Sequence, residues 1–215
     1  ADTGATVRFK MDPDYHRATL GDNFSLSDMT WSPDASKLAC VATARGERWA
    51  VLRVAGAATG AVRAVRDESG ATHYEAGTGW RILWAAGEVI WYSQRDDWGH
   101  LYLYDLAPGK LKNQITTGEG PVSQIVRVDE KARTLHFMAM GREKGQDPYF
   151  RHAYRVGLDG KGYVSLTPDD GDHDIQLSPS GKYLVDTYST CEKPPVVVLR
   201  DLTGKLIMPL EKADI

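Results

Sequence analysis

The sequence has few cysteines, no long apolar segment and almost no excess charge. Its 215 residues include two cysteines, Cys40 and Cys191, in neither a CxxC pair nor a Cys/His spacing. This excludes a disulfide scaffold and a zinc site. Apolar runs such as 194–199 are far shorter than a membrane span. The first nine residues are small and polar, so we expect no signal peptide there.

The composition is that of an ordinary globular protein. Hydrophobic residues make up 42% of the chain and charged residues 26%, with a formal net charge of −3. This balance gives no electrostatic reason to bind nucleic acid or an anionic membrane, so we expect neither as a partner. We also expect no cofactor and no metal.

Glycine and aromatic residues are plentiful, and the glycines repeat at a regular spacing. The chain has 21 Gly, 10 Tyr and 6 Trp. Small-residue turns recur around Gly4, Gly60, Gly109, Gly160 and Gly204. Most of these turns follow an apolar strand-like segment, at 49–54, 101–106, 153–156 and 197–202. A Ser-Pro turn also repeats, at Ser32-Pro33 and Ser178-Pro179.

Each repeat reads as strand, tight turn, strand, longer loop, strand, glycine turn, strand. A unit of roughly 45–55 residues with this order is the size of a propeller blade. We therefore predict an all-β chain, a partial β-propeller of about four four-stranded antiparallel blades. The blades are predicted at about 27–67, 79–116, 121–166 and 174–210, within 23–215. Residues 1–22 are predicted to be a linker and the tail of a preceding blade, with 5–9 as its last strand.

Two strands are apolar on both faces. Val89–Tyr92 and Leu101–Tyr104 lack the polar alternation of a sheet with one wet face. Because alternate side chains point to opposite faces, both faces must be covered, as they are between neighbouring blades.

A helix is the competing interpretation for 33–44. Ser32 could cap it, with Pro33 in the first turn. The matching stretch 179–188 contains Gly181 and several β-formers, which favours strands in both places.

Several segments resemble the N-terminal propeller of the dipeptidyl peptidase IV family, of the prolyl oligopeptidase class of serine peptidases. They are Leu26–Asp34, Trp91–Asp105, Met140–His152, Val185–Ser189, Pro194–Val196 and Leu210–Asp214. The resemblance implies blades five to eight of an eight-bladed propeller, ahead of an α/β-hydrolase domain that this chain lacks. It also implies a peptide substrate, cleavage after proline or a small residue, and export to the periplasm or beyond.

No catalytic residue is predicted. No serine has glycine two residues before it and two after it, as a nucleophile elbow requires. The family's dipeptidyl peptidases hold the substrate amine with paired glutamates, and the chain has no Glu-Glu pair. The choice between exopeptidase and endopeptidase therefore stays open.

Trp80 and Arg81 are the candidate substrate-binding residues. The resemblance implies an arginine after a Gly-Trp near the entrance to the active site, and Gly79-Trp80-Arg81 is similar to it. The residues that follow are shorter and less polar than the family's. The structural alternative is a packed Trp80 and a solvated Arg81.

Other polar clusters favour structural interpretations. Asp96–His100 suggests a metal site, but its residues are good turn formers. The run Asp169–Asp174 lacks the order of a calcium loop and is predicted to be a solvated linker. Arg142–Lys144 is predicted to be a charged hairpin tip or a contact with the hydrolase domain. The isolated histidines are predicted to be structural or on the surface: His16, His73, His136 and His152.

Two functions from different classes remain. The first is a non-catalytic domain that gates peptide access to a serine peptidase and scaffolds it. The second is a TolB-like propeller that binds proteins. We further expect free thiols at both cysteines, and self-association through exposed blade faces.

Overall fold

The computed structural model describes residues 4–11, 16–17, 29–44, 46, 48–74 and 79–213. The chain divides into two compact units, Ala1–Ser93 with Leu103–Lys112 and Gln94–Tyr102 with Asn113–Ile215. No helix in the described ranges is long and apolar enough to cross a membrane.

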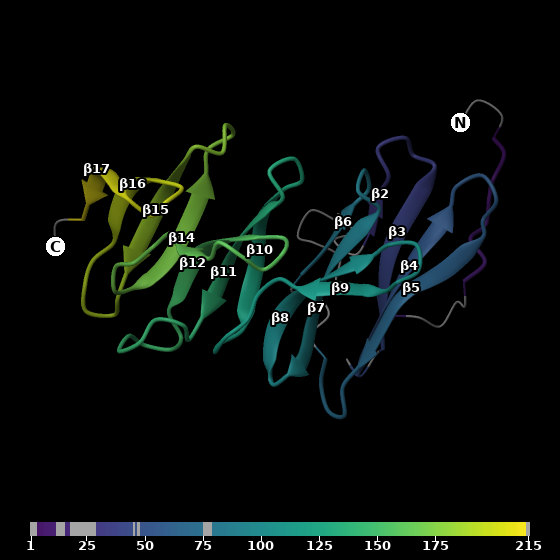
Figure 1. Ribbon diagram of the computed structural model, residues 1–215, viewed down its shortest axis with the longest axis horizontal. Coiled ribbons are helices and arrows are strands. Elements are labelled where there is room, and N and C mark those ends of the chain that lie inside the picture. The colour runs from purple at the N-terminus through teal and green to yellow at the C-terminus, as the bar shows by residue number, and fades with distance from the viewer. Residues whose placement is uncertain are drawn as a thin grey trace. The chain divides into compact units, whose positions relative to one another are not determined.

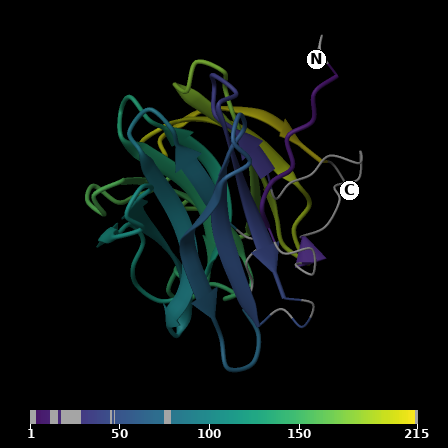
Figure 2. The ribbon, with the colours of Figure 1, turned by 90° about the vertical axis from the view of Figure 1, so that its right-hand side faces the viewer.

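The described residues form four antiparallel sheets, two of them in the first half of the chain (Figure 1). The first contains β1 (His16–Arg17), β2 (Met29–Trp31), β3 (Lys37–Thr43), β4 (Trp49–Gly56) and β5 (Val62–Ser69). Its strands β3, β4 and β5 lie side by side, as the long blue arrows of Figure 2 show. The second contains β6 (Trp80–Leu83), β7 (Glu88–Asp96), β8 (Trp98–Asp105) and β9 (Leu111–Gln114).

The second half of the chain repeats the pattern twice. The third sheet contains β10 (Val122–Asp129), β11 (Thr134–Met140), β12 (Arg151–Gly157) and β13 (Val164–Ser165). The fourth contains β14 (Asp172–Leu177), β15 (Tyr183–Ser189), β16 (Val196–Asp201) and β17 (Leu206–Lys212). In each of the last three sheets the strands pair in chain order. The predicted all-β class and four-stranded meanders are confirmed.

The first sheet departs from the prediction in two ways. The two-residue strand β1 adds a fifth strand, since it pairs with the same strand, β3, as β2 does. Residues 5–9 were expected to be a strand, and this is wrong for the described chain, where they pair with no strand. Instead the Lys10 N–H donates a 2.9 Å hydrogen bond to the Gly60 carbonyl. Residues 27 and 28, at the predicted start of the first blade, lie outside the described residues.

The repeated Ser-Pro turns close hairpins by the same hydrogen bonds. The Ser32 hydroxyl accepts from the Lys37 N–H at 2.9 Å, and the Ser178 hydroxyl accepts from the Tyr183 N–H at 3.1 Å. Each serine N–H donates in return to the opposite carbonyl, of Lys37 or Tyr183. Residues 33–44 thus form a turn followed by β3, which confirms the strand and excludes the helix.

The two cysteines are free thiols, as predicted. Cys40 is buried in β3, and Cys191 is exposed in the loop between β15 and β16.

The repeated glycine turn brings one backbone against another. Gly109 has φ +67°, and a Cβ added there would lie 2.2 Å from the Val65 carbonyl oxygen of β5. Such a distance leaves no room for any other residue. The corresponding contacts are Gly60 with Arg8, Gly160 with Gln114 and Gly204 with Ser165. The regular spacing of glycines in the sequence therefore marks the positions where each turn packs closely against the backbone of another segment. Residues 5–9, though not a strand, contact the Gly60 turn as outer strands contact the other glycines.

Candidate functional site

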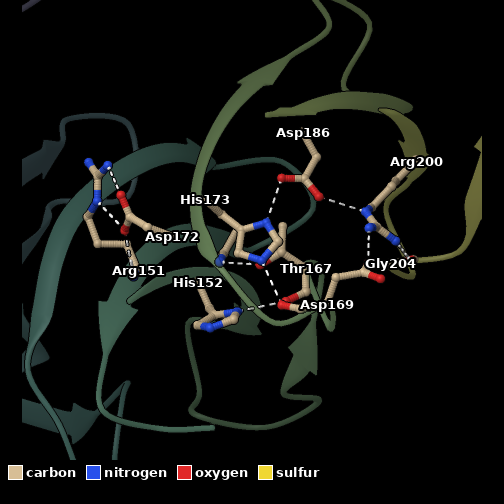
Figure 3. A network of polar contacts seen from close by, with 10 residues as sticks. Arg151, His152, Thr167, Asp169, Asp172, His173, Asp186, Arg200 and Gly204 are labelled. Atoms are coloured by element: carbon tan, nitrogen blue, oxygen red, sulfur yellow. Dashed lines mark hydrogen bonds and ion pairs between the residues drawn. The ribbon is translucent and has the colours of Figure 1, made fainter. Parts of the chain in front are cut away.

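A buried network of charged side chains holds the fourth sheet together (Figure 3). The Asp186 carboxylate on β15 accepts from His173 Nδ1 on β14 at 2.7 Å and from Arg200 Nε on β16 at 2.8 Å. Arg200 also donates to the carboxylate of Asp169 and, at 3.1 Å, to the Gly204 carbonyl. His173 and Asp186 are fully buried. The network thus joins three strands and the loop before them.

His173 cannot act as a general base in this arrangement. Its Nδ1 faces the Asp186 carboxylate, and its Nε2 lies 2.8 Å from the Asp169 carbonyl oxygen. Both ring nitrogens are therefore occupied by acceptor groups of the protein. A general base needs a free lone pair within reach of a substrate proton. Burial opposes the charge on Arg200, but its hydrogen bonds to Asp186 and Asp169 raise its pKa. The network is a structural clamp.

A second histidine packs against this clamp, with its ring tilted relative to that of His173. The rings of His152 and His173 are 4.7 Å apart, and Tyr188 lies against His173 at 4.9 Å. His152 Nδ1 donates to the Thr167 carbonyl at 2.8 Å, which leaves Nε2 buried without a partner among the described residues. Burial lowers the pKa of His152.

The acidic run Asp169–Asp174 is more ordered than predicted. Asp172 accepts from Arg151 Nε at 2.9 Å and Nη2 at 2.7 Å, and this pairing lowers the pKa of Asp172. The prediction of a solvated linker holds for the exposed Asp170. It is wrong for Asp172, His173 and Asp174, which lie on β14, and for Asp169, which pairs with Arg200. The cause is the arginines that reach these groups from other strands. One signal in the sequence could have indicated these ion pairs. Asp186 and Arg200 are single charged residues within otherwise largely apolar strand segments, and such charges need buried partners.

Trp80 and Arg81 lie on β6 beside a cavity of about 240 Å³. Trp80 is buried, whereas Arg81 is exposed. Met29, Thr30 and Ile82 complete the lining. Arg81 Nη1 donates to the Trp80 carbonyl at 2.8 Å, and burial of part of the side chain lowers its pKa. The structure thus brings the two predicted residues together at a small opening.

Asp96–His100 forms a tight turn. Asp97 has φ +71° between β7 and β8, and exposed Asp96 accepts from Gln114 Nε2 at 2.8 Å. His100 is buried and contacts the Thr116 hydroxyl and the Gly118 carbonyl. In the part of the chain that the structure describes, no three His, Cys, Asp or Glu residues gather as a metal site would require.

A largely buried carboxylate in the first compact unit was not among the predicted site residues. Glu68 on β5 accepts from Trp91 Nε1 at 3.0 Å, from Arg66 Nη2 at 3.1 Å and from the Ser93 hydroxyl. Tyr74 stacks on Trp91 and donates to the Tyr92 carbonyl at 2.6 Å. Burial, followed by the Glu68 charge, raises the pKa of Tyr74. Ser93 donates to the Glu68 carboxylate, whereas the serine of a hydrolase triad donates to a histidine.

Arg142 was predicted to be part of a charged tip, but it is half-buried against aromatic rings. Its guanidinium lies 5.8 Å from the rings of Phe137 and Tyr154, and 5.9 Å from that of Tyr163. Glu143 accepts from the Tyr154 hydroxyl at 2.9 Å. Only Lys144 of the predicted tip is exposed.

Comparison with known proteins places these repeats in a family. The family model of the dipeptidyl peptidase IV N-terminal region matches residues 6–195. The chain belongs to this family. Dipeptidyl peptidase 4 of Arthroderma otae is 31% identical to this chain over 98 residues. These residues make up 45% of this chain and 12% of that protein.

Solved structures of dipeptidyl peptidase IV relatives have the same fold. A structure named for a dipeptidyl aminopeptidase IV of Bacteroides ovatus has a TM-score of 0.73 at 25% identity. The match covers 87% of this chain and 29% of that one. Dipeptidyl peptidase 4 of Porphyromonas gingivalis has a TM-score of 0.72 at 22% identity over 86% of this chain and 26% of its own. The chain therefore spans a small part of each relative.

Proposed function

We propose that this chain is a non-catalytic part of a propeller that gates peptide access to an α/β-hydrolase domain and scaffolds it, in a serine peptidase of the dipeptidyl peptidase IV kind. The observation that carries the proposal is the family match over residues 6–195. A domain in this role acts by excluding water and large substrates rather than by bond chemistry.

The state of the chain's own polar groups supports a non-catalytic role. The two most enzyme-like groups are already engaged by other groups of the protein. His173 contacts the Asp186 carboxylate and the Asp169 carbonyl, and Ser93 donates to the Glu68 carboxylate. Acyl transfer instead needs a nucleophile, a base and an oxyanion hole within reach of one another.

Arg81 is the residue we propose to contact the peptide. It lines a cavity beside a buried Trp80, and a guanidinium, with N–H donors in a fixed fork, suits a peptide carbonyl or carboxylate. As a positioning group it would lower KM without taking part in the chemistry.

The proposal is tested on this chain and on a longer protein that carries it with a hydrolase domain. Both are treated with an active-site serine probe and an alanyl-prolyl chromogenic substrate. We expect labelling and turnover of the longer protein alone. In that protein Arg81→Ala should raise KM about tenfold, whereas Lys131→Ala, an exposed turn residue, should change nothing.

Two results would overturn this proposal. Labelling of the 215-residue chain would show that it is catalytic. A longer protein that is neither labelled nor active would favour the alternative, a TolB-like protein-binding module.

A further inference from the structure

The third and fourth sheets both lie in the second compact unit and pack against each other through a small apolar cluster. The cluster consists of four buried residues: Met138, Ala153, Leu166 and Leu184. Leu184 lies on β15, whereas the other three belong to the third sheet or directly follow it. Two buried histidines of the third sheet, His136 and His152, also reach this interface.

His136 faces the fourth sheet between two arginines. It lies two residues before Met138 on β11, so its side chain points to the same face of the sheet. Its register partners are Arg127 on β10 and Arg155 on β12. Both ring nitrogens are buried and lack a hydrogen-bond partner among the described residues. A proton on this ring therefore places three cations in one row across the sheet.

Few negative charges oppose that row. Burial, then Arg155 and Arg127, lower the pKa of His136, and Asp129 opposes them. The turn before β11 carries three further charged groups: Glu130, Lys131 and Arg133. The surroundings of His136 thus contain more cations than carboxylates.

Arg127 links this row to the fourth sheet. Its Nη1 donates to the Ser178 carbonyl at 3.4 Å, in the turn between β14 and β15. Gly181 of the same turn lies so close that an added Cβ would be 2.9 Å from that nitrogen. The charged residue of this turn is Lys182, so the turn brings no carboxylate to the row. Repulsion within the row therefore acts on the contact between the two sheets.

His152 lies in a second contact between the same sheets. Its ring, on β12, is 4.7 Å from that of His173 on β14 (Figure 3). Burial lowers the pKa of His152, and His173 adds to the effect. The acidic groups that oppose it are Glu143 and Asp186. The ionised side chains around the two rings form ion pairs: Arg151 with Asp172, and Arg200 with Asp169 and Asp186.

We propose that acid opens the interface between the third and fourth sheets before the rest of the chain unfolds. Protons on His136 and His152 place cations in a buried interface, and separation of the sheets returns both rings to water. The opening exposes the apolar cluster around Met138 and Leu184. This inference concerns the conformation of the chain and does not depend on the proposed peptidase role.

The test is hydrogen–deuterium exchange of the 215-residue chain at pH 7.5 and pH 5, read by mass spectrometry and corrected for the intrinsic effect of pH. A His136 pKa of about 4 when the interface is closed, against 6.5 when it is open, predicts about thirtyfold more opening at pH 5. We expect this increase in peptides from β11, β12 and β14. Peptides from β3 and β4 of the first sheet should change little.

Two substitutions test the role of His136. His136→Leu should reduce the increase to about threefold, which is the part that His152 supplies, and its protection at pH 7.5 shows whether it folds. Arg155→Gln keeps the ring but removes a flanking cation, which raises the folded pKa of His136. It should make the increase about threefold smaller, and it decides alone if His136→Leu does not fold. His73→Leu removes an exposed histidine of the first compact unit and is the matched control.

Four results would overturn the proposal. Equal increases in all four sheets would show that acid unfolds the whole chain at once. Equal protection at the two pH values would show that the interface stays closed. The other two are an increase that Arg155→Gln leaves intact, and equal effects of His136→Leu and His73→Leu.

Discussion

The second and fourth sheets share a topology but are stabilised differently. The β6–β9 sheet buries a long series of apolar side chains, including Val89, Ile90, Trp91 and the run Leu101–Tyr104. In the strands of the β14–β17 sheet, only Leu184 and Val198 are buried apolar residues. Its other fully buried groups include His173, Asp186 and Arg200. One sheet is held by apolar burial and the other by a charged clamp.

The outer strand of the fourth sheet, β17, also contributes little apolar burial. Every residue of β17 is exposed, including Leu206, Ile207, Met208 and Leu210. Apolar burial tolerates changes of shape, whereas a buried ion network fails when one member is lost. The fourth sheet should therefore be the more sensitive of the two to single polar substitutions.

Removing the central carboxylate of the clamp should have the largest effect. Asp186→Ala leaves Arg200 and His173 buried without their partner, so we expect a loss of about 3–5 kcal/mol in unfolding free energy. Urea denaturation measures it. Asp174→Ala, an exposed aspartate on β14, should cost less than about 0.5 kcal/mol. Equal effects of the two substitutions would show that the network contributes nothing special.

The glycine turns test packing between neighbouring sheets. In Gly109→Ala the new Cβ would overlap the Val65 carbonyl at a left-handed φ, so we expect a loss of at least about 3 kcal/mol. Gly87 has a similar φ of +63° but nothing within 4 Å of an added Cβ. Gly87→Ala should therefore cost only about 1 kcal/mol, for the backbone alone. Thermal unfolding of the pair compares them; similar losses would mean that the close approach is not needed.

His136 in the third sheet is a buried titratable group without a clamp. Its two ring nitrogens have no partner among the described residues. Burial, then Arg155 on β12 and Arg127 on β10, lower its pKa to about 4, against the opposing charge of Asp129. The folded pKa lies below the unfolded value, so its contribution to stability is full above pH 6.5 and is lost as the pH falls toward 4.

The substitution His136→Leu should remove the loss of unfolding free energy that protonation of His136 causes at acid pH. Relative to the unsubstituted chain, the variant should gain on the order of 2 kcal/mol at pH 5 and change little at pH 7.5. Denaturation at the two pH values measures the difference. A variant that loses stability equally at both would show that the ring is needed for packing rather than tolerated.

The exposed strand β17 should give the smallest change in stability. Ile207→Lys should alter the unfolding free energy by less than about 0.5 kcal/mol, because the side chain is 44% exposed. We expect the unsubstituted chain to self-associate through such faces, and the variant to do so less. Light scattering after size exclusion tests both, with Lys205→Arg as the control. A compact monomer at high concentration would rule out self-association.

Much of the fold could be predicted from the sequence, because the repeats constrain it. The glycine period and the doubled Ser-Pro turn predicted strands where local propensity alone allowed a helix at 33–44. The apolar segments 89–92 and 101–104 correctly indicated burial on both faces. Residues 5–9 misled because a strand needs a hydrogen-bonded neighbour in its own sheet, and local pattern does not supply one.

The candidate sites were harder to predict from the sequence than the strands were, because the partners of their side chains come from distant strands. Asp172 and His173 looked solvated because Arg151 and Asp186 are not their sequence neighbours. Glu68 gave no local signal, because Trp91 and Ser93 lie on another sheet. Arg142 was predicted to be a tip residue because the rings that pack around its guanidinium are not its sequence neighbours. They are Phe137, Tyr154 and Tyr163.

The sequence by itself determined the strand order, the hairpin turns and the positions where only glycine fits. Each of these depends on residues close together in the chain, through backbone dihedrals and alternation along a strand. Only the tertiary structure decided which charges are buried in pairs, which arginine sits among aromatic rings and which apolar strand stays exposed. Those outcomes depend on desolvation, and whether a side chain loses its water is fixed by what other segments bring beside it.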